Sequence, residues 1–202
     1  MQISSIVTRL AWSALGVMAT SLGLGCSGPA PEPSGGTTSA YRAYSEDVKL
    51  YEKPYGVGGV DNPLKDATSV WARAKVVTDK DVADAVAAGN DWPTAPSTRV
   101  RLGLSGAPAD TNFLAHVHVG DCASPAGPLG HYALGDKEIH LDFKTDGDGN
   151  GSMMTKVEFA VASGAAHSIV IHDAVEKDGG GKPAKLACIS IHFNDPEAAA
   201  SE

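Results

Sequence analysis

The chain has 202 residues, enough for one domain of ordinary size with extensions and a buried core. Its formal net charge is −8, and its 16 Lys and Arg residues form no cluster along the sequence, so we expect no nucleic-acid partner. Glycine is abundant, at 23 residues, and aromatic residues make up only 6% of the chain. This composition is typical of a fold of short strands joined by many turns.

Residues 1–25 have the layout of a signal peptide. Arg9 precedes an apolar run over residues 10–19, and the segment ends in Leu-Gly-Leu-Gly-Cys at Cys26. That ending resembles the cleavage box of bacterial lipoproteins, in which the cysteine becomes the lipid-modified first residue of the mature chain. We therefore expect an exported protein, lipid-anchored through Cys26 in the bacterial cell envelope, in the periplasm or at the outer membrane. The alternative is an ordinary secretory signal without a lipid on Cys26.

The segments that flank the expected domain are polar. Residues 26–47 are rich in Pro, Gly and Ser and predict a flexible linker, and residues 48–66 form a lead-in segment without a clear pattern. The domain is expected at residues 67–195, followed by a disordered tail at 196–202. Outside the signal no apolar run is long enough to span a membrane, so the membrane partner is expected through the lipid alone.

From residue 67 onward, short segments alternate apolar and polar residues, as half-buried strands do. Strands are predicted at residues 69–77, 98–105, 113–122, 153–160, 167–172 and 186–193. Residues 81–89 predict a short helix ending at Gly89. Residues 146–151 predict a turn rather than a calcium loop, because no glutamate stands at the twelfth position and no helix follows. The pattern predicts an all-β, antiparallel sandwich or barrel.

The predicted strand at 113–122 carries two histidines, His116 and His118. Because side chains alternate along a strand, these imidazoles project together, and Val117 and Val119 are expected on the opposite, apolar face. The two histidines are candidate ligands of one metal ion. Imidazole suits copper, zinc, iron and nickel, so the pair does not choose the metal. His-x-His pairs also occur on solvated sheet faces without a metal.

The remaining histidines and cysteines follow in an order that resembles the copper/zinc superoxide dismutase family. His131 follows a Gly-rich turn, and His172 ends the run Ile-Val-Ile-His. The resemblance covers roughly residues 67–194 and implies a Greek-key β-sandwich or barrel. It also implies a copper site with four ligands, namely His116, His118, His131 and His172.

The resemblance also implies a disulfide between Cys122 and Cys188. In an exported protein, two cysteines besides Cys26 are expected to pair. Closing a loop of this length contributes on the order of 4 kcal/mol in the chain-entropy model.

The zinc half of the family's site is altered in this chain. Only nine positions separate His131 from His140, one zinc histidine is missing, and His140-Leu141-Asp142 replaces the family's pattern. Shortened loops resemble the copper-only branch, in which an acidic side chain orients the former bridging histidine. Glu138, His140 and Asp142 are the candidates for that role. We expect copper without zinc, and zinc held by His131, His140 and Asp142 is the alternative.

Three residues before the final cysteine the resembling family has an arginine, and this chain has Lys185. A lysine keeps the positive charge but lacks the planar, two-point fork of arginine. The resemblance implies conversion of superoxide to dioxygen and hydrogen peroxide, with His131 and Lys185 as the catalytic residues. Lys182 is a candidate helper, and the alternative that we favour for it is a solvated surface lysine. The alternative function is a non-catalytic, copper-binding envelope lipoprotein. His167 and His192 match no ligand position. A homodimer is compatible with the sequence.

Overall fold

The computed structural model describes residues 41–44, 48–55, 61–124, 127–178 and 180–193. These residues all belong to one compact unit, Gly36–Glu202. The elements in chain order are β1 (Tyr41–Tyr44), β2 (Val48–Tyr55), β3 (Ser69–Val77), α1 (Asp79–Ala87), β4 (Ser97–Ser105), β5 (Asn112–His118), β6 (Ala133–Leu134), β7 (Lys137–Glu138), β8 (Phe143–Lys144), β9 (Gly151–Val157), β10 (Ser168–Lys177) and β11 (Pro183–Ser190).

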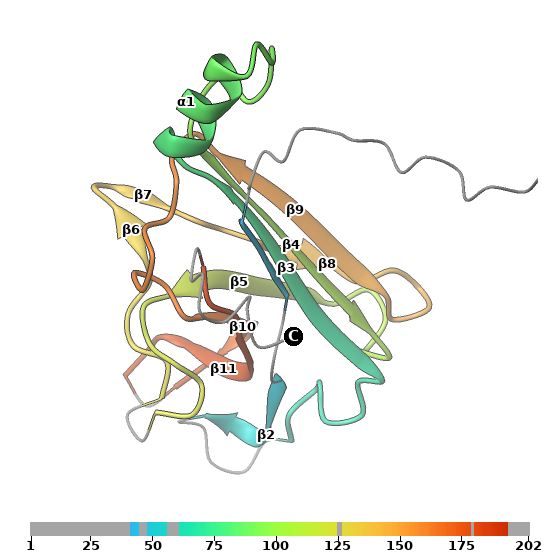
Figure 1. The fold of residues 1–202 in the computed structure, drawn as a ribbon. Helices are drawn as coiled ribbons and strands as arrows, with labels where there is room; N and C mark the ends of the chain where they lie inside the picture. The colour runs from blue at the N-terminus through green and yellow to red at the C-terminus, as the bar shows by residue number, and fades with distance from the viewer. Residues whose placement is uncertain (1–40, 45–47, 56–60, 125–126, 179, 194–202) are drawn as a thin grey trace, which may run out of the picture. The chain divides into compact units, whose positions relative to one another are not determined.

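The strands pair antiparallel in two main sheets (Figure 1). One sheet has the order β1-β3-β4-β9, and the other has the order β2-β11-β10-β5-β8. β6 and β7 form a separate hairpin. The prediction of a mostly antiparallel β fold is confirmed.

The larger of two hydrophobic clusters among the described residues is the core between the two sheets. β3 and β4 contribute alternate residues to it, including Ala72, Val100 and Leu102, and β10 contributes Ile169 and Ile171. All of these side chains are buried, while the residues between them on β3 and β4 are mostly polar and more exposed. The period-2 pattern therefore identified the core face of both strands correctly.

The helix begins two residues before the predicted start. Thr78 is its N-cap, accepting a hydrogen bond from the Asp81 backbone N–H, and the Asp81 carboxylate in turn accepts from the Thr78 backbone N–H at 2.7 Å. This capping box satisfies backbone donors that would otherwise have no partner at the first turn. After the last helical residue, Gly89 adopts a φ of +71°, which glycine tolerates without steric cost.

The sheets include two strands that the sequence analysis placed in the linker and the lead-in segment. β1 pairs with β3, and β2 pairs with β11, so the folded part starts well before residue 67. Asn62 fastens the chain after β2: its buried side-chain amide donates to the backbone carbonyls of Tyr51 and Leu186, and its side-chain oxygen accepts from the Leu64 N–H.

The expected turn at residues 146–151 is present. The Asp146 carboxylate accepts backbone N–H groups from Asp148 and Asn150, at 3.0 and 2.8 Å. The expected signal peptide at 1–25, the expected lipid site at Cys26 and the tail at 196–202 lie outside the described residues. Within the described ranges no helix has the length and apolar character needed to cross a membrane.

Candidate metal centre

β5 supplies the first two histidines of the centre. Its core face carries Phe113, Ala115 and Val117, while His116 and His118 share the other face. Both histidines are buried, at 7% and 2% exposure. The prediction that the two imidazoles project together is confirmed for the strand.

Val119 does not lie in the apolar layer as predicted. β5 ends at His118, and the side chain of Val119 is 37% exposed. The backbone bends away after His118, so the alternation of faces does not extend to the next residue. That change of direction starts the loop that returns with His131.

The segment of residues 130–141 lies along the edge of β5 that does not face β10. Its backbone exchanges hydrogen bonds with β5, including Tyr132 N–H to the Val117 carbonyl at 2.8 Å and Leu141 N–H to the Ala115 carbonyl at 2.7 Å. Isolated bridges place His131 opposite His118 and His140 opposite His116. Backbone pairing thus brings a loop histidine to the strand pair.

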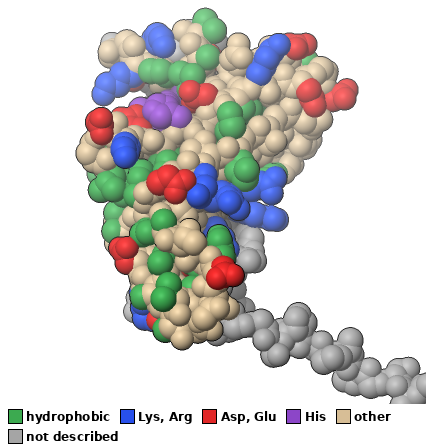
Figure 2. Space-filling view, turned by 90° about the horizontal axis from the view of Figure 1, so that it is seen from above, with side chains coloured by type: hydrophobic (Ala, Val, Ile, Leu, Met, Phe, Trp, Pro, Cys, Tyr) green, Lys and Arg blue, Asp and Glu red, His purple; other side chains and the backbone are tan. Residues whose placement is uncertain are grey.

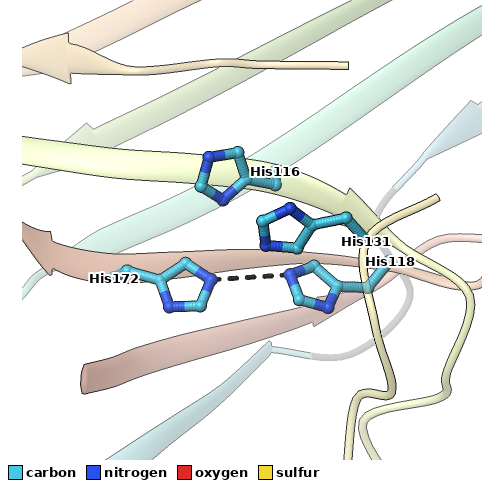
Figure 3. A group of neighbouring side chains, drawn as sticks. All are labelled: His116, His118, His131 and His172. Carbon is cyan, nitrogen blue, oxygen red and sulfur yellow. Dashed lines mark hydrogen bonds between the residues drawn. The ribbon is translucent and has the colours of Figure 1, made fainter. Parts of the chain in front are cut away.

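β10 supplies the fourth histidine. β10 pairs with β5 in a register that sets Val170 opposite His116, so His172 lies two residues further along and on the same face. Figure 3 shows the four rings of His116, His118, His131 and His172 turned toward a common centre. One ring nitrogen from each lies within 4.8 Å of the others.

The tautomers of two of these rings follow from their backbone contacts. His118 Nδ1 lies 2.6 Å from the Leu129 carbonyl oxygen, and His172 Nδ1 lies 3.1 Å from the Pro183 carbonyl oxygen. A carbonyl only accepts, so each Nδ1 carries the hydrogen and each neutral ring presents a lone pair at Nε2. These two Nε2 atoms are 3.4 Å apart, drawn as the dashed line in Figure 3. Two lone pairs facing each other are favourable only with a cation between them.

Glu138 determines the tautomer of the third ring, that of His131, through a similar hydrogen bond. Its Oε2 accepts a hydrogen bond from His131 Nδ1 at 2.8 Å, which leaves Nε2 of His131 with the lone pair. The hydrogen bond from His131 lowers the pKa of the Glu138 carboxyl. In the fourth ring, Nδ1 of His116 is buried and has no hydrogen-bond partner among the described residues. A buried polar atom without a partner is costly unless a ligand binds it.

The buried rings are neutral at physiological pH. Burial, with a smaller contribution from neighbouring imidazoles, lowers the pKa of His116 to about 4. Burial likewise lowers the pKa of His118 to about 3 and that of His172 to about 4, in both cases against a raising effect of the backbone hydrogen bond. Metal ligation requires neutral imidazole, so these three side chains are in the required state without help from the ion.

This donor set fits a metal ion. Metal–nitrogen bonds of about 2.0–2.1 Å place donors on opposite sides of an ion about 4 Å apart, close to the observed spread. Three rings have their second nitrogen engaged by a carbonyl or a carboxylate, which is the usual way that proteins fix a ligating imidazole. The group can therefore bind a metal ion, with Nδ1 of His116 and Nε2 of the other three as donors.

The residues expected around a zinc ion lie beside this group. Asp142 Oδ1 accepts the Ala115 N–H at 2.9 Å and lies 3.8 Å from His116 Nε2, and His140 Nε2 lies 3.4 Å from Glu138 Oε2. A second set of potential ligand atoms comprises His116, His140 and Asp142. The carboxylate of Glu138, rather than His140 or Asp142, contacts Nδ1 of His131.

The four histidines open into a cavity of about 640 Å³. Lys185, Lys182, Asp178 and Glu138 are its charged lining residues. Lys185 Nζ donates to the Pro128 carbonyl at 3.0 Å, and burial lowers the pKa of this lysine. Both lysines that sequence analysis singled out therefore lie at the centre. The contribution of Asp178 was not foreseen, because no motif marks it.

The expected disulfide joins Cys122 to Cys188, which are 66 positions apart in the sequence. It ties the loop after β5 to β11, where it packs against buried Val170. The side chains of His167 and His192 do not belong to the four-histidine group and contact each other, Nδ1 to Nδ1, at 3.2 Å. Their exclusion from the ligand set agrees with this arrangement.

Comparisons with known proteins do not assign the chain to a family. No family model matches the chain, and no curated protein matches it significantly.

Proposed function

We propose that this protein is an extracytoplasmic superoxide dismutase that uses copper held by His116, His118, His131 and His172. The observation that carries the proposal is the convergence of four imidazole nitrogens, each presenting a lone pair, at the base of a solvent-accessible cavity. The order of these histidines and of the disulfide cysteines resembles the copper/zinc superoxide dismutase family, and the proposed fold is the family's Greek-key sandwich.

The donor chemistry supports copper. An all-nitrogen, four-donor site suits Cu(II), which also stands highest in the general order of affinities for divalent metals. The position of Glu138 supports a site without zinc, because its carboxylate takes the nitrogen of His131 that would otherwise face a second ion. In a site without zinc, His140 helps to position the Glu138 carboxylate, and Asp142 helps to position the backbone of β5 at Ala115.

Copper, when bound, supplies the electron transfer: one superoxide gives up an electron and leaves as dioxygen, and a second takes up that electron with two protons and leaves as hydrogen peroxide. His131 is the side chain suited to delivering a proton from Nε2, because its side chain is 36% exposed whereas the other three rings are buried. Glu138 keeps the ring oriented through Nδ1 while Nε2 gains or loses its proton.

Lys185 supplies positive charge to the cavity wall. Its Nζ donates to the Pro128 carbonyl and lies in the lining of the cavity, so its positive charge helps to attract an anion of the size of superoxide. Lys182 lines the same cavity. A superoxide molecule must reach the four histidines from solvent, and the cavity provides this access.

The test is metal content and dismutation rate on one preparation of the full chain offered both copper and zinc. We expect about one copper per chain, no stoichiometric zinc and rapid dismutation. His172→Asn should lose copper, while Lys185→Gln should keep copper and slow dismutation, with Lys80→Gln on α1 as the charge-matched control. Copper without turnover would instead support the non-catalytic copper-binding lipoprotein. Failure to bind copper would overturn both.

A further inference from the structure

A row of three positive side chains crosses the outer face of the β1-β3-β4-β9 sheet. In the sheet register Lys75 lies opposite Arg99, and Arg99 lies opposite Lys156. Side chains in such positions start about 4.5–5.5 Å apart, and like charges placed there destabilise a sheet. Such a row concentrates positive charge on one face of a chain whose net charge is −8.

The neighbouring row extends the positive charge. Arg73 lies opposite Arg101, and both are exposed on the same face. Figure 2 shows Lys and Arg side chains gathered in one band near the middle of that view. This cluster cannot be recognised in the sequence, because alternation along three separate strands spreads its members over more than 80 positions.

The row lines a cavity of about 100 Å³ on this face. The loop after α1 closes one side with Trp92 and Thr94, and Ser97 contributes a hydroxyl. The volume corresponds to roughly three water molecules, which suits one tetrahedral oxyanion rather than a large ligand.

Contacts inside the cavity set the positions of two cations. Lys75 Nζ lies 4.3 Å from the centroid of the Trp92 ring, a cation–π contact that holds the ammonium at the wall. Lys156 pairs with Glu158 at 2.8 Å. Among the described residues that line the cavity, Glu158 is the single acidic one.

From this arrangement we infer that the cavity bounded by Lys75, Arg99 and Lys156 is a binding site for a phosphate group. Arg99 offers a planar fork of donors for phosphate oxygens, the two ammonium groups add charge, and the hydroxyls of Thr94 and Ser97 complete the polar lining. The phosphate belongs either to free inorganic phosphate or to the headgroup of an anionic phospholipid. This site is separate from the histidine centre in its residues and does not depend on the proposed function.

Calorimetric titration of the full chain with inorganic phosphate tests the site. We expect saturable binding of one phosphate per chain, and Arg99→Gln should weaken it about tenfold or more, the usual effect of losing a charge-assisted contact. Arg101→Gln is the matched control, since it removes the same charge from the same face and strand two residues away, outside the cavity lining. The affinity of the Arg101→Gln variant for phosphate should stay within about twofold of the affinity of the unmodified protein.

Vesicles distinguish the two sources of phosphate. Stronger binding to phosphatidylglycerol than to phosphatidylcholine vesicles, lost in Arg99→Gln and kept in Arg101→Gln, identifies the lipid headgroup; saturable binding of inorganic phosphate without that preference identifies the free ion. Equal losses in the two variants would mean diffuse surface charge and overturn the site. Absence of phosphate binding together with vesicle binding insensitive to Arg99→Gln would also overturn it.

Discussion

The carboxylate of Glu138 lies 2.8 Å from Nδ1 of His131 and thereby decides which nitrogen of that ring faces the other three histidines. We expect Glu138→Ala to weaken copper binding about 10- to 100-fold, the usual loss when the partner of a ligating imidazole is removed. Competition against a chromophoric chelator measures the change. Asp136→Ala, which removes an exposed carboxylate between β6 and β7, should leave copper affinity unchanged. Equal affinities in the two variants would contradict the role of Glu138.

Acid should destabilise the metal-free protein through the buried histidines. The folded-state pKa values of about 4 for His116 and His172 and about 3 for His118 lie below the ordinary value of 6.5, so the unfolded chain binds more protons as pH falls. The free energy of unfolding should therefore be highest above pH 6.5 and fall toward pH 4, with each histidine contributing a slope of at most about 1.4 kcal/mol per pH unit.

Urea denaturation in the presence of a chelator, repeated from pH 7.5 to pH 4.5, measures this dependence. His118→Asn removes one of the three titrating groups and should flatten the curve. A free energy of unfolding that stays constant between pH 7 and pH 5 would show that these imidazoles are not held neutral by burial.

Gly120 and Gly130 offer a paired test of the loop after β5. A Cβ added to Gly120 would lie 2.2 Å from the Leu129 backbone nitrogen, whereas one added to Gly130 would meet no atom within 4 Å. Because the Leu129 carbonyl accepts the hydrogen bond from His118, Gly120→Ala should lower both the melting temperature and copper affinity. Gly130→Ala should change neither. Similar behaviour of the two variants would mean that this loop does not position His118.

Replacing both Cys122 and Cys188 with serine should lower the free energy of unfolding by about 4 kcal/mol, because the unfolded chain loses a cross-link that closes a loop of 66 positions. Chemical denaturation under oxidising conditions measures the loss. A reducing agent should destabilise the unmodified protein by a similar amount and leave the double variant unaffected. A double variant as stable as the unmodified protein would contradict the expected contribution.

The sequence predicted the strands with alternating core residues and the set of histidines that meets at the centre. It did not predict β1 and β2, which lie at the edges of their sheets. Edge strands tolerate charged residues and proline, such as Lys53 and Pro54, so their sequence lacks the apolar pattern of an inner strand. Val119 was placed on the wrong face because periodicity does not reveal where a strand ends.

Other parts of the site leave no trace in the sequence. The carbonyls of Leu129 and Pro183 fix two imidazole tautomers, but every residue has a carbonyl, so their role depends only on backbone geometry. The row formed by Lys75, Arg99 and Lys156 depends on the register of three strands. Glu138 was one of three acidic or imidazole candidates, and only the backbone pairing of residues 130–141 with β5 distinguishes among them.

Because β5 carries core residues on one face and two ligands on the other, forming the hydrophobic core already completes most of the centre. Copper uptake should then be a local event in a folded protein, with almost no change in heat capacity, unlike a zinc finger, whose chain folds only when the metal arrives. The protein could then fold where copper is scarce and take up the ion later, without unfolding.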